Sequence, residues 1–406
     1  MRRREFIAGG AQLAAGLLAT RVAFAEARGG RARFVLVILR GALDGLAAVP
    51  PLGDPDYPGL RRELAFRGPG EPGGALPLDG FFGLHPALGF LHECYGSREL
   101  TVLHAVASPY RERSHFDGQD VLENGTSHPH ALQTGWLNRA LSASPTRGGR
   151  EAGVSLGQNL PLVMRGPAAV TSWSSSRLAA LDEDTLARIT DLYAGDALLA
   201  PRLADALAAN AIAAAGEGDG GMPKPVDGPG AARGKARYAE VVRAAAGFLR
   251  REDGPKVAVF DTSGWDTHAN EGAAQGQLAG RLAELDAGLA MLRTELGTTW
   301  KDTAVLLVTE FGRTAALNGT RGTDHGTATV AFLLGGAVAG GRVLVDWPGL
   351  AAHRLYQGRD LAATLDVRAL LKGVLAEQLD VSPQSLEREV FPDSSAMRPL
   401  RGLIRA

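Results

Sequence analysis

The chain contains the run Arg33-Phe34-Val35-Leu36-Val37-Ile38-Leu39, followed at once by the glycine-rich turn Arg40-Gly41-Ala42-Leu43-Asp44-Gly45-Leu46. A continuous β-prone run without polar alternation is typical of a strand that is buried on both faces of a parallel sheet. Similar apolar runs recur at residues 303–309 and 329–334, and a shorter one lies at 256–260. These runs predict the central strands of one sheet, each followed by polar residues.

Segments with helical periodicity lie between the apolar runs. Strands that alternate with helices predict an α/β fold, with a mostly parallel central sheet and helices on both faces. A further strand is expected at 100–106, and residues 50–80, dense in Pro and Gly, predict a surface loop. A largely helical region is expected at about 177–251. The other helices that we expect cover residues 85–95, 114–123 and 275–296.

Composition excludes several classes of protein. The 406 residues include 43 Lys+Arg and 44 Asp+Glu, and the formal net charge of −1 argues against a dedicated nucleic-acid-binding protein. A hydrophobic fraction of 45% argues against a mainly disordered chain. The single cysteine, Cys94, excludes an internal disulfide and a cysteine-rich metal site. After the N-terminal region no segment has the ~18 consecutive apolar residues of a membrane span.

The N-terminus has the layout of an export signal. Met1-Arg2-Arg3-Arg4-Glu5-Phe6-Ile7 places paired arginines before a mildly apolar stretch, and Ala23-Phe24-Ala25 supplies small residues for cleavage. An ordinary basic amphipathic helix is the alternative. We predict a twin-arginine signal peptide at 1–25 and one α/β domain at 26–406, with the helical region as an insertion. The twin-arginine translocase and a signal peptidase would then be partners, and the periplasm the destination.

Residues capable of chemistry collect where the predicted strands end, which is where ligands bind in parallel α/β sheets. Carboxylates and imidazoles are the side chains that hold zinc, manganese or magnesium. A single histidine in such a motif is more often a hydrogen-bonded structural residue, so the prediction depends on all of the motifs together. The residues in question are Asp44, Ser114, His115, Asp117, Asp261, Asp266, His268, Glu310, Arg313, Asp324 and His325.

Three of these residues have alternative interpretations. Ser114, with Asp117 three residues later, would either cap a helix or act as a nucleophile stabilised by the helix N-terminus. Arg313 would either clamp a substrate anion or pair with a carboxylate such as Glu310. His115 would contact the substrate or a metal, or form a structural hydrogen bond.

The motifs together resemble a known family. With the export signal, they are similar to domain-of-unknown-function family 1501, exported bacterial proteins placed in the alkaline phosphatase-like superfamily of sulfatases and phosphoglycerate mutases. The likeness runs from about residue 33 to 380. The motifs are, in chain order, Leu39-Arg40-Gly41-Ala42-Leu43-Asp44-Gly45, Arg113-Ser114-His115-Phe116-Asp117, Gly264-Trp265-Asp266-Thr267-His268, Thr309-Glu310-Phe311-Gly312-Arg313-Thr314 and Asp324-His325-Gly326.

The resemblance implies a two-metal site at the carboxyl ends of the strands, with a nucleophile at a helix start. Ser114 corresponds to that nucleophile, and Arg313 and His115 would bind the substrate. The metal ligands that the resemblance implies are Asp44 and Glu310 for one ion, and Asp266 (or Asp261), His268 and His325 for the other.

One position departs from the superfamily pattern. Phe311 stands where a histidine ligand is expected, so the site with Asp44 and Glu310 would keep oxygen ligands only, which suit magnesium or calcium better than zinc. The expected function is an exported metal-dependent hydrolase of phosphate or sulfate esters, acting on a small anionic ester or glycan. The alternative is a catalytically silent envelope protein that binds a glycan or protein partner through the same cleft.

Overall fold

The protein is described by a computed structural model. The signal peptide expected at 1–25 lies outside the residues that it describes. The helices of these residues are too short or too polar to cross a membrane. The residues described are 30–145, 152–175, 183–197, 199–215 and 230–406.

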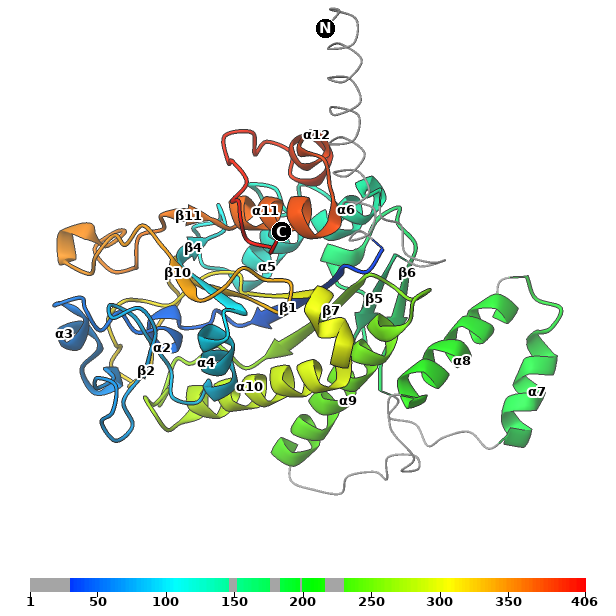
Figure 1. Cartoon of the computed structure of the whole chain (residues 1–406), viewed down its shortest axis with the longest axis horizontal. Coiled ribbons are helices and arrows are strands. Elements are labelled where there is room, and N and C mark those ends of the chain that lie inside the picture. The colour runs from blue at the N-terminus through cyan, green and yellow to red at the C-terminus, as the bar shows by residue number, and fades with distance from the viewer. Residues whose placement is uncertain (1–29, 146–151, 176–182, 198, 216–229) are drawn as a thin grey trace, which may run out of the picture.

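A mixed, mostly parallel sheet forms the centre of the molecule (Figure 1). The neighbours of β1 on both sides are parallel to it, whereas β9 runs antiparallel to both of its neighbours. The expected α/β fold is confirmed, and the orientation of β9 is the departure from a purely parallel sheet. The strand order is β10 (Arg342–Leu344), β4 (Leu100–Ala107), β9 (Thr329–Leu334), β8 (Thr303–Val308), β1 (Arg33–Arg40), β7 (Val257–Ser263), β5 (Gly153–Leu156) and β6 (Val170–Trp173), with β11 (Leu365–Asp366) paired to β4.

Helices cover both faces of this sheet (Figure 1). One face carries α4 (Gly89–Gly96), α9 (Gly230–Arg250) and α10 (Gln277–Leu296), and the other carries α5 (His115–Asn124), α6 (Trp136–Ala143) and α11 (Val367–Leu379). The remaining helices of the described residues are α2 (Gly45–Ala48), α3 (Tyr57–Arg61), α7 (Glu183–Tyr193), α8 (Leu199–Ala215) and α12 (Pro383–Ser385). Short 3-10 or π segments lie at Arg62–Leu64, Leu162–Met164, Gly297–Asp302, Ala352–Arg354 and Leu386–Val390. A small hairpin pairs β2 (Leu76–Pro77) with β3 (Gly83–Leu84).

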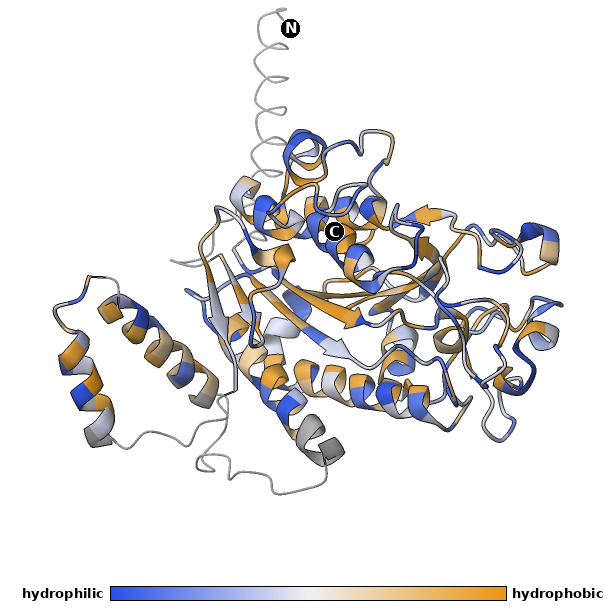
Figure 2. Cartoon of the chain, turned by 180° about the vertical axis from the view of Figure 1, so that it is seen from behind, coloured by the Kyte–Doolittle hydropathy of each residue, from blue (hydrophilic) through white to orange (hydrophobic). Residues whose placement is uncertain are grey.

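Strand β1 divides the core into two halves. Val35 and Val37 pack with the apolar side chains of α9 and α10, while Leu36 and Ile38 pack with those of α6 and α11. Because successive side chains of a strand point to opposite faces, burial of both faces requires an unbroken apolar run. Each buried side chain of this size stabilises the fold by roughly 1.5–3 kcal/mol. The hydropathy colouring shows apolar strands between helices whose outer faces are polar (Figure 2).

The Pro- and Gly-rich region at 50–80 is more than a surface loop. Its helix α3 contains Tyr57 and Arg61, and both side chains are almost fully buried beside the carboxyl end of β1. Sequence composition alone did not predict this burial. As a consequence, Arg61 forms an ion pair with a carboxylate that was expected to bind metal.

Candidate functional site

The polar motifs meet at the edge of the sheet where β1, β7 and β8 end. Gly41, just after β1, has a φ of +121°, and a Cβ on it would lie 2.8 Å from the backbone nitrogen of Asp266. Only glycine combines that conformation with so close an approach. The turn after β1 therefore packs directly against the loop after β7, and brings the two motifs together.

Asp266 lies at the centre of a cluster of three histidines. Its Oδ1 is 3.0 Å from Nε2 of His268 and 3.2 Å from Nε2 of His325, and its Oδ2 is 3.5 Å from Nε2 of His115. The Nε2 atoms of His268 and His325 are 3.0 Å apart. The ligand atoms of His115, Asp266 and His325 all lie within 4.8 Å of one another.

Each imidazole has an oxygen partner at its Nδ1 atom. A neutral imidazole that donates its Nδ1 proton to an oxygen keeps a lone pair on Nε2, and this is how histidine ligands are oriented around metals. The Nε2 atom of His115 is buried and has no hydrogen-bond partner among the described residues. The oxygen partners are Glu310 for His115 (2.8 Å), Asp324 for His268 (3.2 Å) and the carbonyl of Arg113 for His325 (2.9 Å).

Electrostatics favour an ionised Asp266 beside a neutral His325. Burial opposes ionisation of Asp266, but the hydrogen bond and charge of Arg313 hold the pKa of this carboxyl below its usual range. Burial lowers the pKa of His325, and the nearby His115 adds to this effect. The hydrogen bond to Glu310 raises the pKa of His115. The anionic carboxylate of Asp266 therefore faces the Nε2 lone pair of His325, whereas Glu310 favours the protonated form of His115.

Arg313 holds Asp266 and is not available to a substrate. Its Nη1 lies 2.5 Å from Oδ1 of Asp266, its Nε donates to the hydroxyl of Thr323 at 3.2 Å, and its Nη2 donates to the carbonyl of Thr323. The side chain is fully buried. Of the two interpretations of Arg313, pairing with a carboxylate agrees with these contacts. The interpretation as a clamp for a substrate anion does not, because all of these groups already have partners within the protein.

Asp44 and Glu310 also have structural partners. Asp44 caps α2 by accepting from the amides of Leu46 and Ala47 through Oδ1, and its Oδ2 pairs with the buried guanidinium of Arg61. Burial opposes ionisation of Asp44, but the charge of Arg61 lowers the pKa of this carboxyl. The structure therefore does not bring Asp44 into the cluster as a free ligand.

Glu310 is fully buried and orients His115. Its Oε1 accepts from the amide of Gly41 (2.9 Å), from Nδ1 of His115 (2.8 Å) and from Gln119 (3.2 Å), while Oε2 accepts from Thr309 (2.9 Å). Both oxygens of Glu310 accept hydrogen bonds from the protein. Glu310 therefore orients His115, in place of the metal-ligand role that was expected for it. The aspartate considered as a substitute for Asp266, Asp261, pairs with Arg40 instead, at 2.8 Å.

Ser114 lies at the first position before α5, between two residues of the site. Arg113, before it, supplies the carbonyl that holds His325, and His115 follows it. The Ser114 side chain caps no helix amide among the described residues, so the capping interpretation is not supported. Phe311 fills the position of the missing histidine and stacks on the ring of His115, with centroids 5.0 Å apart.

Two functional neighbours had no sequence signal. Arg61 lies in the Pro- and Gly-rich region, and Glu271 lies just after the Asp266–His268 motif but belongs to no motif itself. Glu271 accepts from the hydroxyl of Thr323 at 2.8 Å, and burial together with the charge of Asp44 raises the pKa of Glu271 to about 8. His115 was expected to contact the substrate or a metal, and the geometry groups it with the metal-type ligands.

The ligand atoms that all lie within 4.8 Å of one another are two imidazole nitrogens and one carboxylate oxygen, and His268 adjoins them at 3.0 Å from both Asp266 and His325. Imidazole ligands suit zinc, whereas manganese, magnesium and calcium prefer mostly oxygen ligands. The buried Nε2 of His115 has no hydrogen-bond partner in the described structure, which also fits a cation at this point.

Comparison with known proteins gives one family and distant structural likenesses. The family model described as "Protein of unknown function (DUF1501)" matches residues 97–389, well over half of the chain. Four of the motifs quoted above lie within the match, and the motif that contains Asp44 precedes it. No curated protein matches the sequence.

Three solved structures illustrate the structural likeness. Ps i-CgsB, solved in complex with k-i-k-neocarrahexaose, is 9% identical over 91% of this chain and 77% of its own, with a TM-score of 0.37. The lipoteichoic acid synthase LtaP from Listeria monocytogenes is 9% identical over 79% and 67%, with a TM-score of 0.35. An alkaline phosphatase superfamily protein from Vibrio parahaemolyticus is 10% identical over 75% and 60%, with a TM-score of 0.29. These likenesses are too distant to carry an argument about the site.

Proposed function

This chain belongs to the DUF1501 family, and we propose that it is an exported, metal-dependent hydrolase of phosphate or sulfate esters. The observation that supports this proposal is the meeting of three imidazole Nε2 atoms and the carboxylate of Asp266 at one edge of the sheet. A twin-arginine signal at residues 1–25 would carry the folded chain across the membrane.

His115, Asp266, His268 and His325 would hold the metal. The buried Nε2 of His115 supports this assignment, because it forms no hydrogen bond with a described residue and its ionic neighbour, Oδ2 of Asp266, is 3.5 Å away. A bound divalent cation supplies a Lewis acid that polarises the ester oxygen. Glu310 and Asp324 fix the tautomers of their histidines, and Arg313 keeps Asp266 anionic and in place.

Ser114 is the proposed nucleophile. Its hydroxyl stands at the start of α5, where the partial positive charge of the helix end favours a developing alkoxide. Ser114 Oγ forms a bond to phosphorus or sulfur as the bond to the alcohol oxygen breaks, and the serine proton leaves with the alcohol. Water then attacks the covalent intermediate, which restores the Ser114 hydroxyl and releases inorganic phosphate or sulfate.

Turnover of aryl phosphate and aryl sulfate esters by the purified chain, with zinc or manganese added, tests this function. We expect Ser114→Ala to lower turnover roughly a thousandfold or more, as loss of a nucleophile does elsewhere. Ser97→Ala, at the far end of α4, is the matched control and keeps turnover unchanged. Unchanged turnover in Ser114→Ala would remove the serine from the mechanism and leave hydrolysis by water.

A binding protein without turnover is the second candidate. It is favoured by Phe311, which replaces a ligand by an apolar ring, and by Arg61, which occupies the carboxylate of Asp44. Together they leave one cluster where the superfamily resemblance implies two metals. A chain that binds metal and hydrolyses neither ester would support this candidate.

A further inference from the structure

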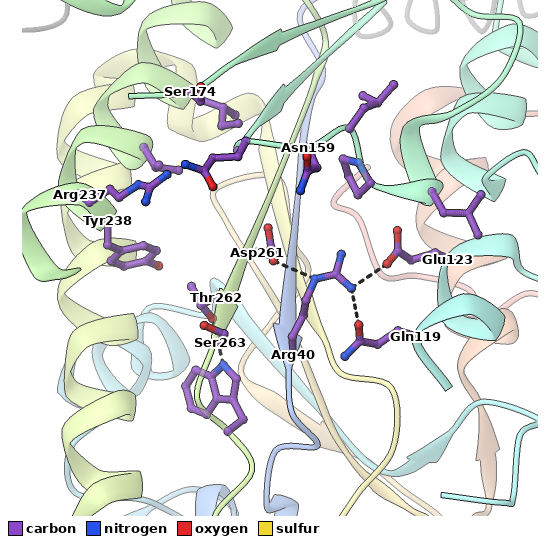
Figure 3. A pocket seen from close by; sticks show the side chains of 18 of the residues that line it. Arg40, Gln119, Glu123, Asn159, Ser174, Arg237, Tyr238, Asp261, Thr262 and Ser263 are labelled. Atoms are coloured by element: carbon purple, nitrogen blue, oxygen red, sulfur yellow. Dashed lines mark hydrogen bonds and ion pairs between the residues drawn. The ribbon is translucent and has the colours of Figure 1, made fainter. Parts of the chain in front are cut away.

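A cavity of about 750 Å³ opens beside the histidine cluster, at the carboxyl ends of β1, β7, β5 and β6. Helix α5 forms one wall, and α9 and α10 form the opposite wall (Figure 3). Cavities of roughly 300–1,000 Å³ hold ligands of drug size. This volume is much more than a phosphate or sulfate group alone would fill.

The cavity and the histidine cluster share a wall. Phe116, which lines the cavity, directly follows His115, and Trp265, which also lines it, directly precedes Asp266. Gln119 connects the two as well, because its oxygen accepts from Arg40 in the cavity (3.0 Å) and its nitrogen donates to Glu310 (3.2 Å). An ester group held at the imidazoles would therefore extend its alcohol portion into this cavity.

At the floor of the cavity one guanidinium is paired with two carboxylates, so these three groups carry one net negative charge. Arg40 lies 2.8 Å from Asp261 and 2.8 Å from Glu123, so its guanidinium is fixed between two carboxylates (Figure 3). Asn159 and Ser174 lie toward the cavity from the loops that follow β5 and β6. These amide and hydroxyl groups can exchange hydrogen bonds with a ligand rich in hydroxyls.

Two neighbouring side chains of α9 line the cavity and lack polar partners among the described residues, but only Arg237 presents its polar group to the cavity. The Tyr238 hydroxyl is buried and makes no hydrogen bond with a described residue. Arg237 forms no hydrogen bond or ion pair with any residue that the structure describes, and Figure 3 shows it directed into the cavity. An unpaired guanidinium that points into the cavity favours a ligand with an anionic group.

Phe116 supplies an apolar surface at the mouth of the cavity. Its side chain is 86% exposed, and it is the only aromatic among the large exposed hydrophobic residues of the described structure. A sugar ring has one face of C–H groups that packs on an aromatic ring while its hydroxyls bond to polar groups at the edge. Polar walls with an aromatic rim therefore fit a carbohydrate better than a purely apolar alcohol.

We propose that this cavity binds an acidic carbohydrate, a sugar chain with a carboxylate, sulfate or phosphate group in addition to the ester at the histidine cluster. Phe116 packs on a sugar ring, Arg237 pairs with the additional anion, and Asn159 and Ser174 bond to hydroxyls. The location beside the ester site rests on the proposed function, but binding in the cavity does not require turnover.

Calorimetric titration of the purified chain with trigalacturonic acid and with the neutral sugar galactotriose tests the inference. We expect the acidic sugar to bind more tightly, and Arg237→Gln to weaken its binding by about tenfold while leaving galactotriose unaffected, since one charge-assisted hydrogen bond is lost. Phe116→Ala weakens both sugars and Phe116→Trp restores them. Arg243→Gln, on the same helix but outside the cavity lining, is the control and changes neither.

The outcomes separate this inference from the proposed function. Turnover of aryl esters without binding of either sugar, or tighter binding of adenosine monophosphate than of trigalacturonic acid, overturns the carbohydrate site and leaves the hydrolase standing. Sugar binding that depends on Arg237 in a chain without turnover supports the site and removes the hydrolase. Sugar binding that is equal in Arg237→Gln and the wild type overturns the assigned cavity.

Discussion

Two carboxylate–arginine pairs lie at the same edge of the sheet, and they differ in what else surrounds them. Asp44 pairs with Arg61 and is almost completely enclosed, with 1% of its side chain exposed. Asp266 pairs with Arg313 but keeps 41% exposure on its other side. The second carboxylate oxygen of Asp44 accepts hydrogen bonds from two helix amides, whereas the second oxygen of Asp266 faces His115.

The comparison shows that residue type alone does not make a ligand. Both aspartates follow a strand in a motif typical of a metal site, yet only Asp266 keeps an oxygen open to imidazoles and to solvent. In Asp44 every hydrogen-bonding direction is used by the chain itself, so the residue stabilises the turn after β1. The same chemical group is thus structural in one pair and available for function in the other.

Replacement of each aspartate by asparagine should give the largest difference between the two pairs. We expect Asp266→Asn to weaken zinc or manganese binding more than about a hundredfold, beyond the 10–100-fold typical of residues that only orient ligands. Asp44→Asn should leave the metal affinity of the folded chain unchanged. Competition with a chelator measures both affinities, and equal losses in the two variants would contradict the distinction.

Removal of the two arginines compares the pairs through stability. Arg61→Leu leaves the charge of Asp44 buried without a partner, and we expect the free energy of unfolding to fall by about 3–5 kcal/mol. Arg313→Leu should cost less, because water reaches the carboxylate of Asp266. Denaturant unfolding of both variants measures the difference, and a larger loss in Arg313→Leu would refute the assignment.

The orientation of His115 can be tested through Glu310. Glu310→Gln keeps the size of the buried side chain but weakens its bond to Nδ1 of His115, so we expect metal affinity to fall about 10–100-fold. Asp324→Asn is the matched change at an exposed position beside His268 and should have a smaller effect. Isothermal titration with zinc measures the two, and an unchanged affinity in Glu310→Gln would remove His115 from the ligand set.

A further prediction concerns the pH dependence of stability near Asp44. Burial and the charge of Asp44 raise the pKa of Glu271 from 4.5 to about 8. Between these values the folded chain binds more protons than the unfolded chain, so the stability contributed by Glu271 is full below pH 4.5 and is lost as the pH rises to about 8. Glu271→Gln stays neutral, and its Tm relative to the wild type should rise over that interval.

The sign of this trend is the test. Thermal melts of the wild type and Glu271→Gln at matched pH values report the difference directly. A difference that stays constant from acid to alkaline pH would show that Glu271 is ionised in the folded chain, contrary to its burial beside Asp44.

Much of the fold was predictable because it follows from local patterns. The apolar run after Arg33 became β1, and the run at 329–334 became β9 at the same bounds. The antiparallel direction of β9 was not predictable, because residues buried on both faces of a sheet look alike in either direction. The short strands β5 and β6 were also not predicted, because four residues give little periodicity.

The site was predictable in part for a similar reason. The motifs pointed to His268 and His325 near Asp266, but His325 precedes β9, and the antiparallel direction of β9 puts its start at the same edge of the sheet. Arg61 could not be foreseen, since its pairing with Asp44 depends on how a Pro- and Gly-rich segment folds back onto the sheet. The role of His115 depended on Glu310, which is 195 residues away in the chain.

The metal content of the purified chain is the most direct test of the cluster. Elemental analysis of the wild type, beside His268→Ala and His325→Ala, should find a stoichiometric divalent metal in the wild type and a loss of it in both variants. The variant Asp44→Asn should keep the metal. A folded wild-type chain that takes up no zinc or manganese, even when either is supplied in excess, would contradict the assignment of His115, Asp266, His268 and His325 as ligands.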